Sequence, residues 1–300
     1  MTINQIDPQT TLSNRIDHIL GPLNDEQRVA VTHGSGPMLV FAGAGSGKTR
    51  VLTRRIAYLI EAQRVDPANI LAVTFTNKAA GEMKQRVIEL SGPAGSRVTV
   101  GTFHSFCARL LRREAERYHL PNFTIYDADD QRSLIKQALR MAEISEQKAH
   151  PAAVLAAISD AKNELKGPER YEPNSYFEEY VRRTYPIYQD LLRQNNALDF
   201  DDLIMETVTY LRDQPDRLEH YASRFQHVLV DEYQDTNHAQ YVLVNLLASR
   251  HGNLFVVGDD DQSIYSWRGA DLRNILEFER DYPAAREIKL EQNYGRPRPF

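Results

Sequence analysis

Eight consecutive residues have the composition of a loop that holds phosphate groups: Ala42-Gly43-Ala44-Gly45-Ser46-Gly47-Lys48-Thr49. The loop follows the apolar run Met38–Phe41 and precedes an amphipathic pattern from Val51 to Ile60. Its glycines let backbone N–H groups turn towards phosphate oxygens, and the amino end of the following helix adds a positive dipole. We expect Lys48 to reach the β- and γ-phosphates and the hydroxyl of Thr49 to bind Mg²⁺. The pattern predicts a nucleoside triphosphate site, against the alternative of a glycine-rich turn formed by chance.

The second chemical motif is Val228-Leu229-Val230-Asp231-Glu232, an apolar strand that ends in two acids. Open α/β sheets place their ligand crevices at the carboxyl ends of the strands. Asp231 there suits contact with Mg²⁺, and Glu232 suits positioning and polarising an attacking water. An acidic turn after a strand is the alternative for this segment alone. Beside the phosphate loop, the acids predict hydrolysis of a nucleoside triphosphate with Mg²⁺ in which Lys48, Asp231 and Glu232 take part.

Composition excludes several other classes of protein. The 300 residues allow a sizeable core and two domains. Lys and Arg total 36 against 41 for Asp and Glu, a formal net charge of -5, so any nucleic-acid site is a local groove. The single cysteine, Cys107, excludes an internal disulfide and a cysteine-rich zinc site, and it fits a cytoplasmic protein. The N-terminus shows no basic segment followed by an apolar run, so we expect no signal peptide. No run of about 18 apolar residues occurs, so we expect no membrane span.

Short apolar runs alternate with helical patterns along most of the chain. The runs are Met38–Phe41, Ile70–Val73, Val98–Val100, His227–Val230 and Leu254–Val257. This alternation predicts an α/β domain with a mainly parallel sheet flanked by helices. From about Leu120 to Ala197 the pattern is helical alone, which predicts an inserted all-helical subdomain. The predicted boundaries are 1–118 and 198–300 for the two parts of the α/β domain and 119–197 for the insertion.

Gln27, in the segment Leu23-Asn24-Asp25-Glu26-Gln27, has two interpretations. A glutamine amide carries a donor and an acceptor, which match the edge of adenine. Alternatively, Asn24 is the N-cap of a helix, and Gln27 three residues later completes a capping box. The spacing alone leaves both open.

Longer motifs carry a resemblance to a known family. They are Thr74-Phe75-Thr76-Asn77-Lys78-Ala79-Ala80, Gly101-Thr102-Phe103-His104-Ser105-Phe106, Leu198-Asp199-Phe200-Asp201-Asp202-Leu203, Asp231-Glu232-Tyr233-Gln234-Asp235-Thr236-Asn237 and Gly258-Asp259-Asp260-Asp261-Gln262-Ser263-Ile264-Tyr265-Ser266-Trp267-Arg268-Gly269-Ala270. With them, the chain resembles superfamily 1 DNA helicases of the UvrD/Rep/PcrA group over about residues 21–294. The resemblance implies a P-loop, RecA-like first motor domain with an inserted helical subdomain. It also implies ATP-driven 3′-to-5′ movement on DNA in repair or replication.

The resemblance assigns roles to individual residues at the nucleotide. It implies that Gln27 reads adenine, that Arg50 and Tyr294 lie beside the nucleotide, and that Gln262 senses the γ-phosphate. For Gln27 it therefore favours the adenine role over the capping box.

The resemblance also implies contacts with single-stranded DNA, made by Phe75, Asn77, His104, Tyr265, Trp267 and Arg268. Aromatic faces stack on any base, which suits a motor that must move over every sequence. Core packing is the alternative for Phe75 and Trp267, and a loop-capping role is the alternative for His104.

The match to the family breaks near the carboxyl end. The family pattern has Arg directly after Tyr and then a small hydroxyl residue, whereas Gly295 follows Tyr294, Arg296 comes one position late and Pro297 follows it. Family members also carry a second RecA-like domain that completes the ATP site. We expect a truncated product whose partners are single-stranded DNA and a second RecA-like domain supplied elsewhere. Because a missing arginine finger commonly costs about 10³–10⁵ in rate, we expect weak ATP binding, slow hydrolysis and no processive unwinding.

Two further functions compete with the helicase motor. One is a module that binds single-stranded DNA or a partner and uses ATP only as a switch, without catalysis. The other is an unrelated P-loop kinase or GTPase, which the motif from Gly258 to Ala270 disfavours.

Overall fold

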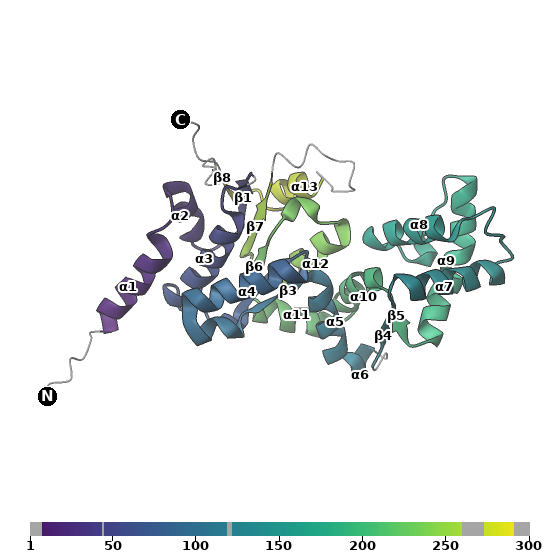
Figure 1. Cartoon of the computed structure of the whole chain (residues 1–300), viewed down its shortest axis with the longest axis horizontal. Coiled ribbons are helices and arrows are strands. Elements are labelled where there is room, and N and C mark those ends of the chain that lie inside the picture. Colours follow the sequence, from purple (N-terminus) through teal and green to yellow (C-terminus); the bar gives the residue numbers. More distant parts are fainter. Residues whose placement is uncertain (1–7, 44, 119–121, 260–272, 291–300) are drawn as a thin grey trace. The chain divides into compact units, whose positions relative to one another are not determined.

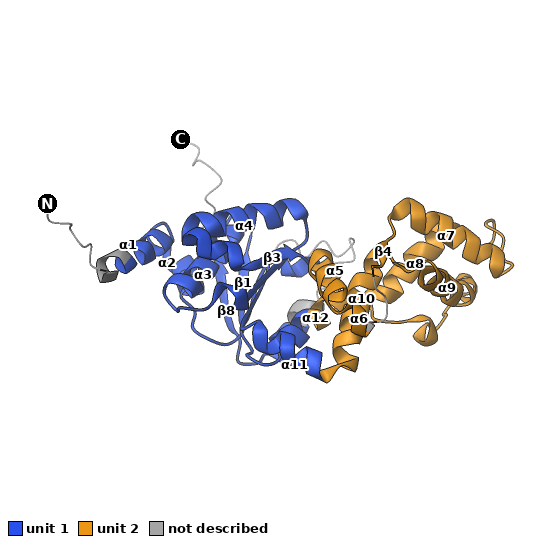
Figure 2. Ribbon diagram, turned by 90° about the horizontal axis from the view of Figure 1, so that it is seen from below, with its two compact units in different colours: residues 1–102, 216–236, 244–300 blue, residues 103–215, 237–243 orange. Residues whose placement is uncertain are grey.

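The computed structural model of the protein describes residues 8–43, 45–118, 122–259 and 273–290. The chain divides into two compact units (Figure 2). Unit 1 comprises residues 1–102, 216–236 and 244–300, and unit 2 comprises residues 103–215 and 237–243. Each unit has its own hydrophobic core.

Unit 1 contains a six-stranded parallel sheet (Figure 1). The strands in spatial order are β3 (Thr99–Thr102), β2 (Ile70–Thr74), β6 (His227–Val230), β7 (Leu254–Gly258), β1 (Met38–Ala42) and β8 (Arg286–Leu290). All five neighbouring pairs are parallel, so the carboxyl ends of the strands meet at one edge of the sheet. The α/β fold with a parallel sheet is confirmed.

The edge strand β8 is absent from the sequence prediction. Three of its five side chains are charged, and four of the five remain at least partly exposed. An edge strand that faces water on one side lacks the continuous apolar run by which buried parallel strands are recognised.

Helices pack around the sheet of unit 1 (Figure 1). They are α1 (Pro8–Leu20), α2 (Asp25–Val31), α3 (Lys48–Glu61), α4 (Asn77–Ser91), α11 (Pro215–Arg224), α12 (His238–Ala248) and α13 (Arg273–Asp281), with short 3₁₀ turns η1 (Pro67–Asn69), η2 (Gly92–Arg97) and η4 (Tyr233–Asp235). Helices α11 and α12 each cross the boundary between the units. Across the described ranges, no helix combines the length and the apolar character needed to cross a membrane.

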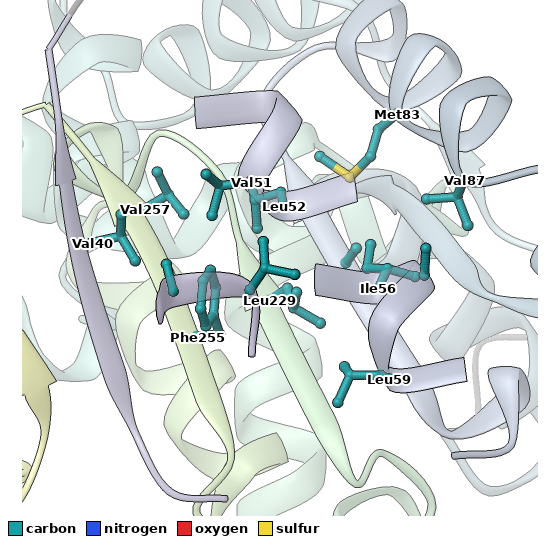
Figure 3. Packing of buried hydrophobic residues seen from close by; sticks show 14 of the residues in the cluster. Val40, Val51, Leu52, Ile56, Leu59, Met83, Val87, Leu229, Phe255 and Val257 are labelled. Carbon is teal, nitrogen blue, oxygen red and sulfur yellow. The ribbon is translucent and has the colours of Figure 1, made fainter. Parts of the chain in front are cut away.

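The core of unit 1 fixes helix α3 against the sheet (Figure 3). Val40, Leu229, Phe255 and Val257 come from three strands, and each is at most 4% exposed. They pack with Val51, Leu52 and Ile56 of α3, all fully buried, in a cluster that also includes Met83 and Val87 of α4. Burial of each such side chain contributes about 1.5–3 kcal/mol. The phosphate loop is therefore held between a buried strand and a buried helix.

Unit 2 is built mainly from helices. They are α5 (Phe103–Arg113), α6 (Ala115–Tyr118), α7 (Ala128–Met141), α8 (Pro151–Asn163), α9 (Tyr176–Gln194) and α10 (Phe200–Asp213), with the 3₁₀ turn η3 (Pro168–Arg170). A short parallel pair of two-residue strands, β4 (Thr124–Ile125) and β5 (Ala197–Leu198), joins them. Strands of two residues leave no periodic pattern, so the sequence did not predict them.

The division into units differs from the predicted boundaries of 119–197. Helices α5 and α10 both belong to unit 2 because they pack on each other. The buried hydroxyl of Tyr210 on α10 donates to Oε2 of Glu114 at 2.9 Å. An amphipathic helix shows which face is apolar but not which neighbour covers it, so the pattern could not assign these helices to a unit.

A buried charged cluster joins α8, α9 and the start of α10. Nζ of Lys162 lies 2.6 Å from Oδ2 of Asp199 and 2.8 Å from Oδ1 of Asp202. The three side chains are 0%, 3% and 0% exposed. Tyr188 donates to Asp199 at 3.0 Å, and Gln189 donates to Asp202 at 3.1 Å. Burial alone would raise the pKa of Asp199, but the charge of Lys162 outweighs it and holds that pKa below its ordinary value.

We predict that Lys162→Met lowers the free energy of unfolding by about 3–5 kcal/mol at pH 7, since it leaves two buried carboxylates without a cation. In the variant both carboxyls have raised pKa values in the folded state, so the loss is larger at pH 8 than at pH 5. Urea denaturation at the two pH values measures this. Arg182→Met, which breaks an exposed pair with Glu179, is the control and costs less than about 1 kcal/mol. Equal losses at both pH values would contradict the assignment.

Candidate nucleotide site

The phosphate loop leaves the end of β1 and enters α3 through two glycines with positive φ. Gly45 has φ 79° and Gly47 has φ 94°, a region that residues with a side chain rarely adopt. A Cβ on Gly47 would also lie 2.9 Å from Nε2 of Gln27. Ser46 closes the turn, because its backbone N–H and its hydroxyl both donate to the carbonyl of Gly43, at 3.1 and 2.7 Å. Ala44 lies outside the described residues.

The amino end of α3 is suited to an anion. Gly47 occupies the N-cap position and offers no side-chain acceptor, and the first turn of the helix contains no acid. The first N–H groups of a helix have no partner within it, and the helix dipole favours negative charge at this end. Thr49 lies in that first turn, and its side chain is partly exposed. The loop therefore fits the phosphates of a nucleotide.

Gln27 ties helix α2 to the phosphate loop. Its backbone N–H donates to Oδ1 of Asn24 at 2.8 Å, and its Oε1 accepts from the N–H of Asn24 at 3.3 Å. This is the capping box that the spacing allowed. Its Nε2 donates to the carbonyl of Ser46 at 2.9 Å, and the side chain is fully buried. Both ends of the amide are thus engaged within the chain, and the adenine role of Gln27 stays a prediction.

Lys48 joins the loop to the ends of two other strands. Its Nζ donates to Oε2 of Glu232 at 3.0 Å and to Oδ2 of Asp259 at 3.1 Å. Burial would lower the pKa of Lys48, but the two carboxylates outweigh it and raise that pKa. Lys48 is therefore fully charged, and its ammonium group is hydrogen-bonded to the two carboxylates. Phosphate oxygens would compete with these carboxylates for the same ammonium group.

Asp231 continues from β6 into the same edge of the sheet, where its N–H donates to the carbonyl of Val73 at 3.0 Å. Its side chain is buried, and Oδ1 accepts from the backbone N–H of Glu232 at 3.1 Å. Burial, followed by the charge of Glu232, raises the pKa of Asp231 to about 6. Carboxylate and hydroxyl oxygens are the ligands that Mg²⁺ prefers. A buried carboxylate with a raised pKa fits a divalent cation, which would compensate its charge.

The chain is similar to known proteins over most of its length. The UvrD/REP helicase N-terminal domain family matches residues 23–283 of the chain. The ATP-dependent DNA helicase PcrA of Staphylococcus aureus (strain Mu50 / ATCC 700699) is 54% identical over 279 residues, which are 92% of this chain and 38% of that protein. PcrA of Staphylococcus epidermidis (strain ATCC 12228 / FDA PCI 1200) is 54% identical over 275 residues, 91% of this chain and 38% of its own length.

The chain belongs to the UvrD/REP helicase N-terminal domain family. It spans well under half the length of the curated relatives that it matches.

In this chain, Arg50 lines a mostly basic cavity of about 410 Å³ on unit 1. The lining residues come from α1, α3 and α4 and are His18, Arg50, Thr53, Arg54, Arg86, Glu89 and Leu90. Arg54 also donates to the carbonyls of His18 and Ile19, so it fastens the end of α1 to α3. Arg50 and Arg54 lie four residues apart on α3, and the packing of α4 brings Arg86 to the same cavity.

The predicted DNA-contacting residues are described only in part. Phe75 follows β2 at the carboxyl edge of the sheet and is partly exposed, while Asn77 is exposed at the start of α4. His104, at the start of α5, meets the ring of Phe200 edge-on at 5.8 Å, and burial lowers its pKa. The remaining predicted residues, Gln262, Tyr265, Trp267, Arg268 and Tyr294, lie outside the described residues. The nucleotide roles of Gln262 and Tyr294 and the DNA roles of the other residues stay predictions.

Asp259 is the main residue of the site that sequence reasoning did not select. It stands in the quoted motif that begins at Gly258, and it is 1% exposed. Its position just after the buried strand Leu254–Gly258 was the available signal, since Asp231 was selected because it follows an apolar strand. Three adjacent aspartates follow Gly258 in the sequence, and only the structure shows that the first of them contacts Lys48.

We predict that Asp231→Asn raises the free energy of unfolding of the nucleotide-free protein by about 1–3 kcal/mol at pH 8. Each unit by which folding raises the pKa of a carboxyl costs about 1.4 kcal/mol of stability once the carboxyl is ionised. The cost of ionising Asp231 in the folded state is fully present above pH 6 and disappears below about pH 4, where neither state is ionised. Urea denaturation at pH 8 and pH 4 measures the difference.

The control for this experiment is Asp66→Asn, on an exposed carboxylate of the same unit. Its pKa is lowered, chiefly by the backbone N–H of Ala68 and also by Arg97, so this variant is expected to lose stability at pH 8. An Asp231→Asn protein that is less stable than the parent at pH 8 would show that ionised Asp231 is compensated without a metal.

Proposed function

We propose that this chain is the nucleotide-hydrolysing part of a DNA helicase, and that it binds and hydrolyses Mg²⁺–ATP in response to single-stranded DNA. The observation that carries the proposal is the contact of Lys48 with Glu232 and Asp259 beside buried Asp231. It gathers a phosphate-binding cation, a candidate general base and a candidate metal ligand at the end of one helix. Both cited relatives are named as ATP-dependent DNA helicases, which supports the same function.

The residues divide the chemistry among them. The N–H groups at the start of α3 and the ammonium of Lys48 would bind the phosphates and exchange the present carboxylate contacts for phosphate oxygens. Asp231 and Thr49 would hold Mg²⁺, which stabilises the charge that develops on the transferred phosphoryl group. Glu232, whose side chain is 36% exposed, would orient the attacking water and accept its proton.

Movement along DNA is the further part of this proposal. Phe75, partly exposed at the same edge of the sheet, would stack on a base, and Asn77, His104, Tyr265, Trp267 and Arg268 would also contact the DNA strand. A 3′-to-5′ direction, a role in repair or replication, a cytoplasmic location and a second RecA-like domain across the nucleotide follow from the resemblance to UvrD, Rep and PcrA.

We predict that Glu232→Gln lowers the rate of ATP hydrolysis by about 10²–10⁴-fold, because it removes the proton acceptor for the attacking water. Affinity for a fluorescent ATP analogue is retained, since the phosphate loop and Lys48 are unchanged. Radiolabelled ATP turnover with and without single-stranded DNA is the measurement.

Glu219→Gln, on an exposed glutamate that pairs with Arg250, is the matched control and keeps the parental rate. If the parent binds nucleotide and DNA but shows no turnover that Glu232→Gln removes, the chain is an ATP-switched binding module and the enzymatic proposal fails.

A further inference from the structure

A closed ring of polar contacts links the phosphate loop to the ends of two strands. Nζ of Lys48 donates to Oε2 of Glu232 and to Oδ2 of Asp259, at 3.0 and 3.1 Å. Nε2 of Gln234 donates to the same Oε2 of Glu232 at 2.9 Å. Oε1 of Gln234 accepts from the backbone N–H of Asp259 at 3.0 Å. The side chain of Gln234 therefore bridges the candidate general base and the end of β7.

The bridge requires an amide. One end of the Gln234 side chain must donate to a carboxylate, and the other must accept from an N–H, which glutamine does and glutamate at neutral pH does not. The side chain is only 4% exposed, so water cannot readily replace either contact. A Cβ on Gly258 would lie 3.3 Å from Oε1 of Gln234, which shows how closely the strand end approaches this amide.

The backbone around Gln234 is held rigidly. Glu232 adopts a left-handed conformation with φ 50°, which persists in a residue with a side chain only where the surroundings enforce it. The 3₁₀ turn after it is closed by the N–H of Asp235 on the carbonyl of Glu232 at 2.9 Å. Fully buried Tyr233 packs edge-on against Phe278 at 5.8 Å between ring centres. Gln234 thus projects from a fixed turn.

These contacts matter most once nucleotide is bound. In the proposed reaction, Lys48 turns to the phosphates, and Glu232 loses the cation that holds its carboxylate. The contact from Gln234 belongs to the same turn as Glu232 and does not depend on Lys48. We propose that Gln234 is the positioning residue that keeps the Glu232 carboxylate aimed at the attacking water. The inference rests on the proposed hydrolysis and adds a residue to which the preceding account gives no role.

The test compares two substitutions of Gln234 in the 300-residue chain, by radiolabelled ATP turnover with saturating single-stranded DNA. Gln234→Met keeps the length of the side chain and removes both contacts. Gln234→Glu keeps an acceptor for the N–H of Asp259 and removes the donor to Glu232. We expect both variants to lose about 10–100-fold in kcat, as for other partners that orient a reactive group. KM and the affinity for a fluorescent ATP analogue should stay within about threefold, because the phosphate loop is untouched.

Gln189→Met is the matched control, since Gln189 is another buried glutamine that donates to a carboxylate, Oδ1 of Asp202, at 3.1 Å. We expect it to lose thermal stability with little change in kcat, whereas a loss of kcat equal to that of Gln234→Met would overturn the inference. A parental kcat in either Gln234 variant, or a loss of nucleotide affinity in proportion to kcat, would also overturn it and leave the proposed hydrolysis standing. If the parent shows no turnover that Glu232→Gln removes, the reaction itself is absent and both proposals fall.

Discussion

The rest of the site depends on the ion pairs that the ammonium group of Lys48 forms. This group lies within 3.1 Å of two carboxylates, Glu232 and Asp259, both of which are far from Lys48 in the sequence. With Asp231 nearby, three acids gather at the end of one helix, and a single lysine contacts two of them. This concentration of negative charge is unfavourable unless cations compensate it. Burial raises the pKa of Asp231, and the charge of Glu232 raises it further. A ligand that brings a divalent cation, as in the proposed function, would compensate this negative charge.

The parallel sheet is what makes this arrangement possible. Because β1, β6 and β7 run in the same direction and are neighbours, the residues that follow them meet at one edge. The core between the strands and α3 then fixes the phosphate loop against that edge. Glycines at 45 and 47 supply the turn, and at 47 the buried amide of Gln27 leaves no space for a side chain. The chemistry therefore depends on packing that is mostly apolar.

A second lysine shows how burial changes the role of the same chemical group. Lys162 also contacts two carboxylates, but its side chain is 0% exposed and its partners also hold hydrogen bonds from Tyr188 and Gln189. Exchange of partners there would leave buried charges uncompensated, so the cluster fixes the junction of three helices. The side chain of Lys48 is 11% exposed and that of Glu232 is 36% exposed, so a ligand can replace one carboxylate contact by another anion. Lysine stabilises the fold in the first setting and is available for binding in the second.

The sequence by itself determined the phosphate loop, the strand before that loop and the strand before Asp231. It also determined the family of the chain. All of these depend on residues that are contiguous in the sequence. Glycine spacing, an apolar run and a following acid are local properties, and backbone conformation follows from them directly. Edge strand β8 and the two-residue strands escaped prediction, since they lack a continuous apolar pattern. Only the tertiary structure decided that Asp259 contacts Lys48, that Gln234 bridges Glu232 to β7, and that Gln27 donates to the carbonyl of Ser46 in the phosphate loop. Each of those contacts joins side chains whose distance depends on how strands and helices pack, which no local pattern encodes.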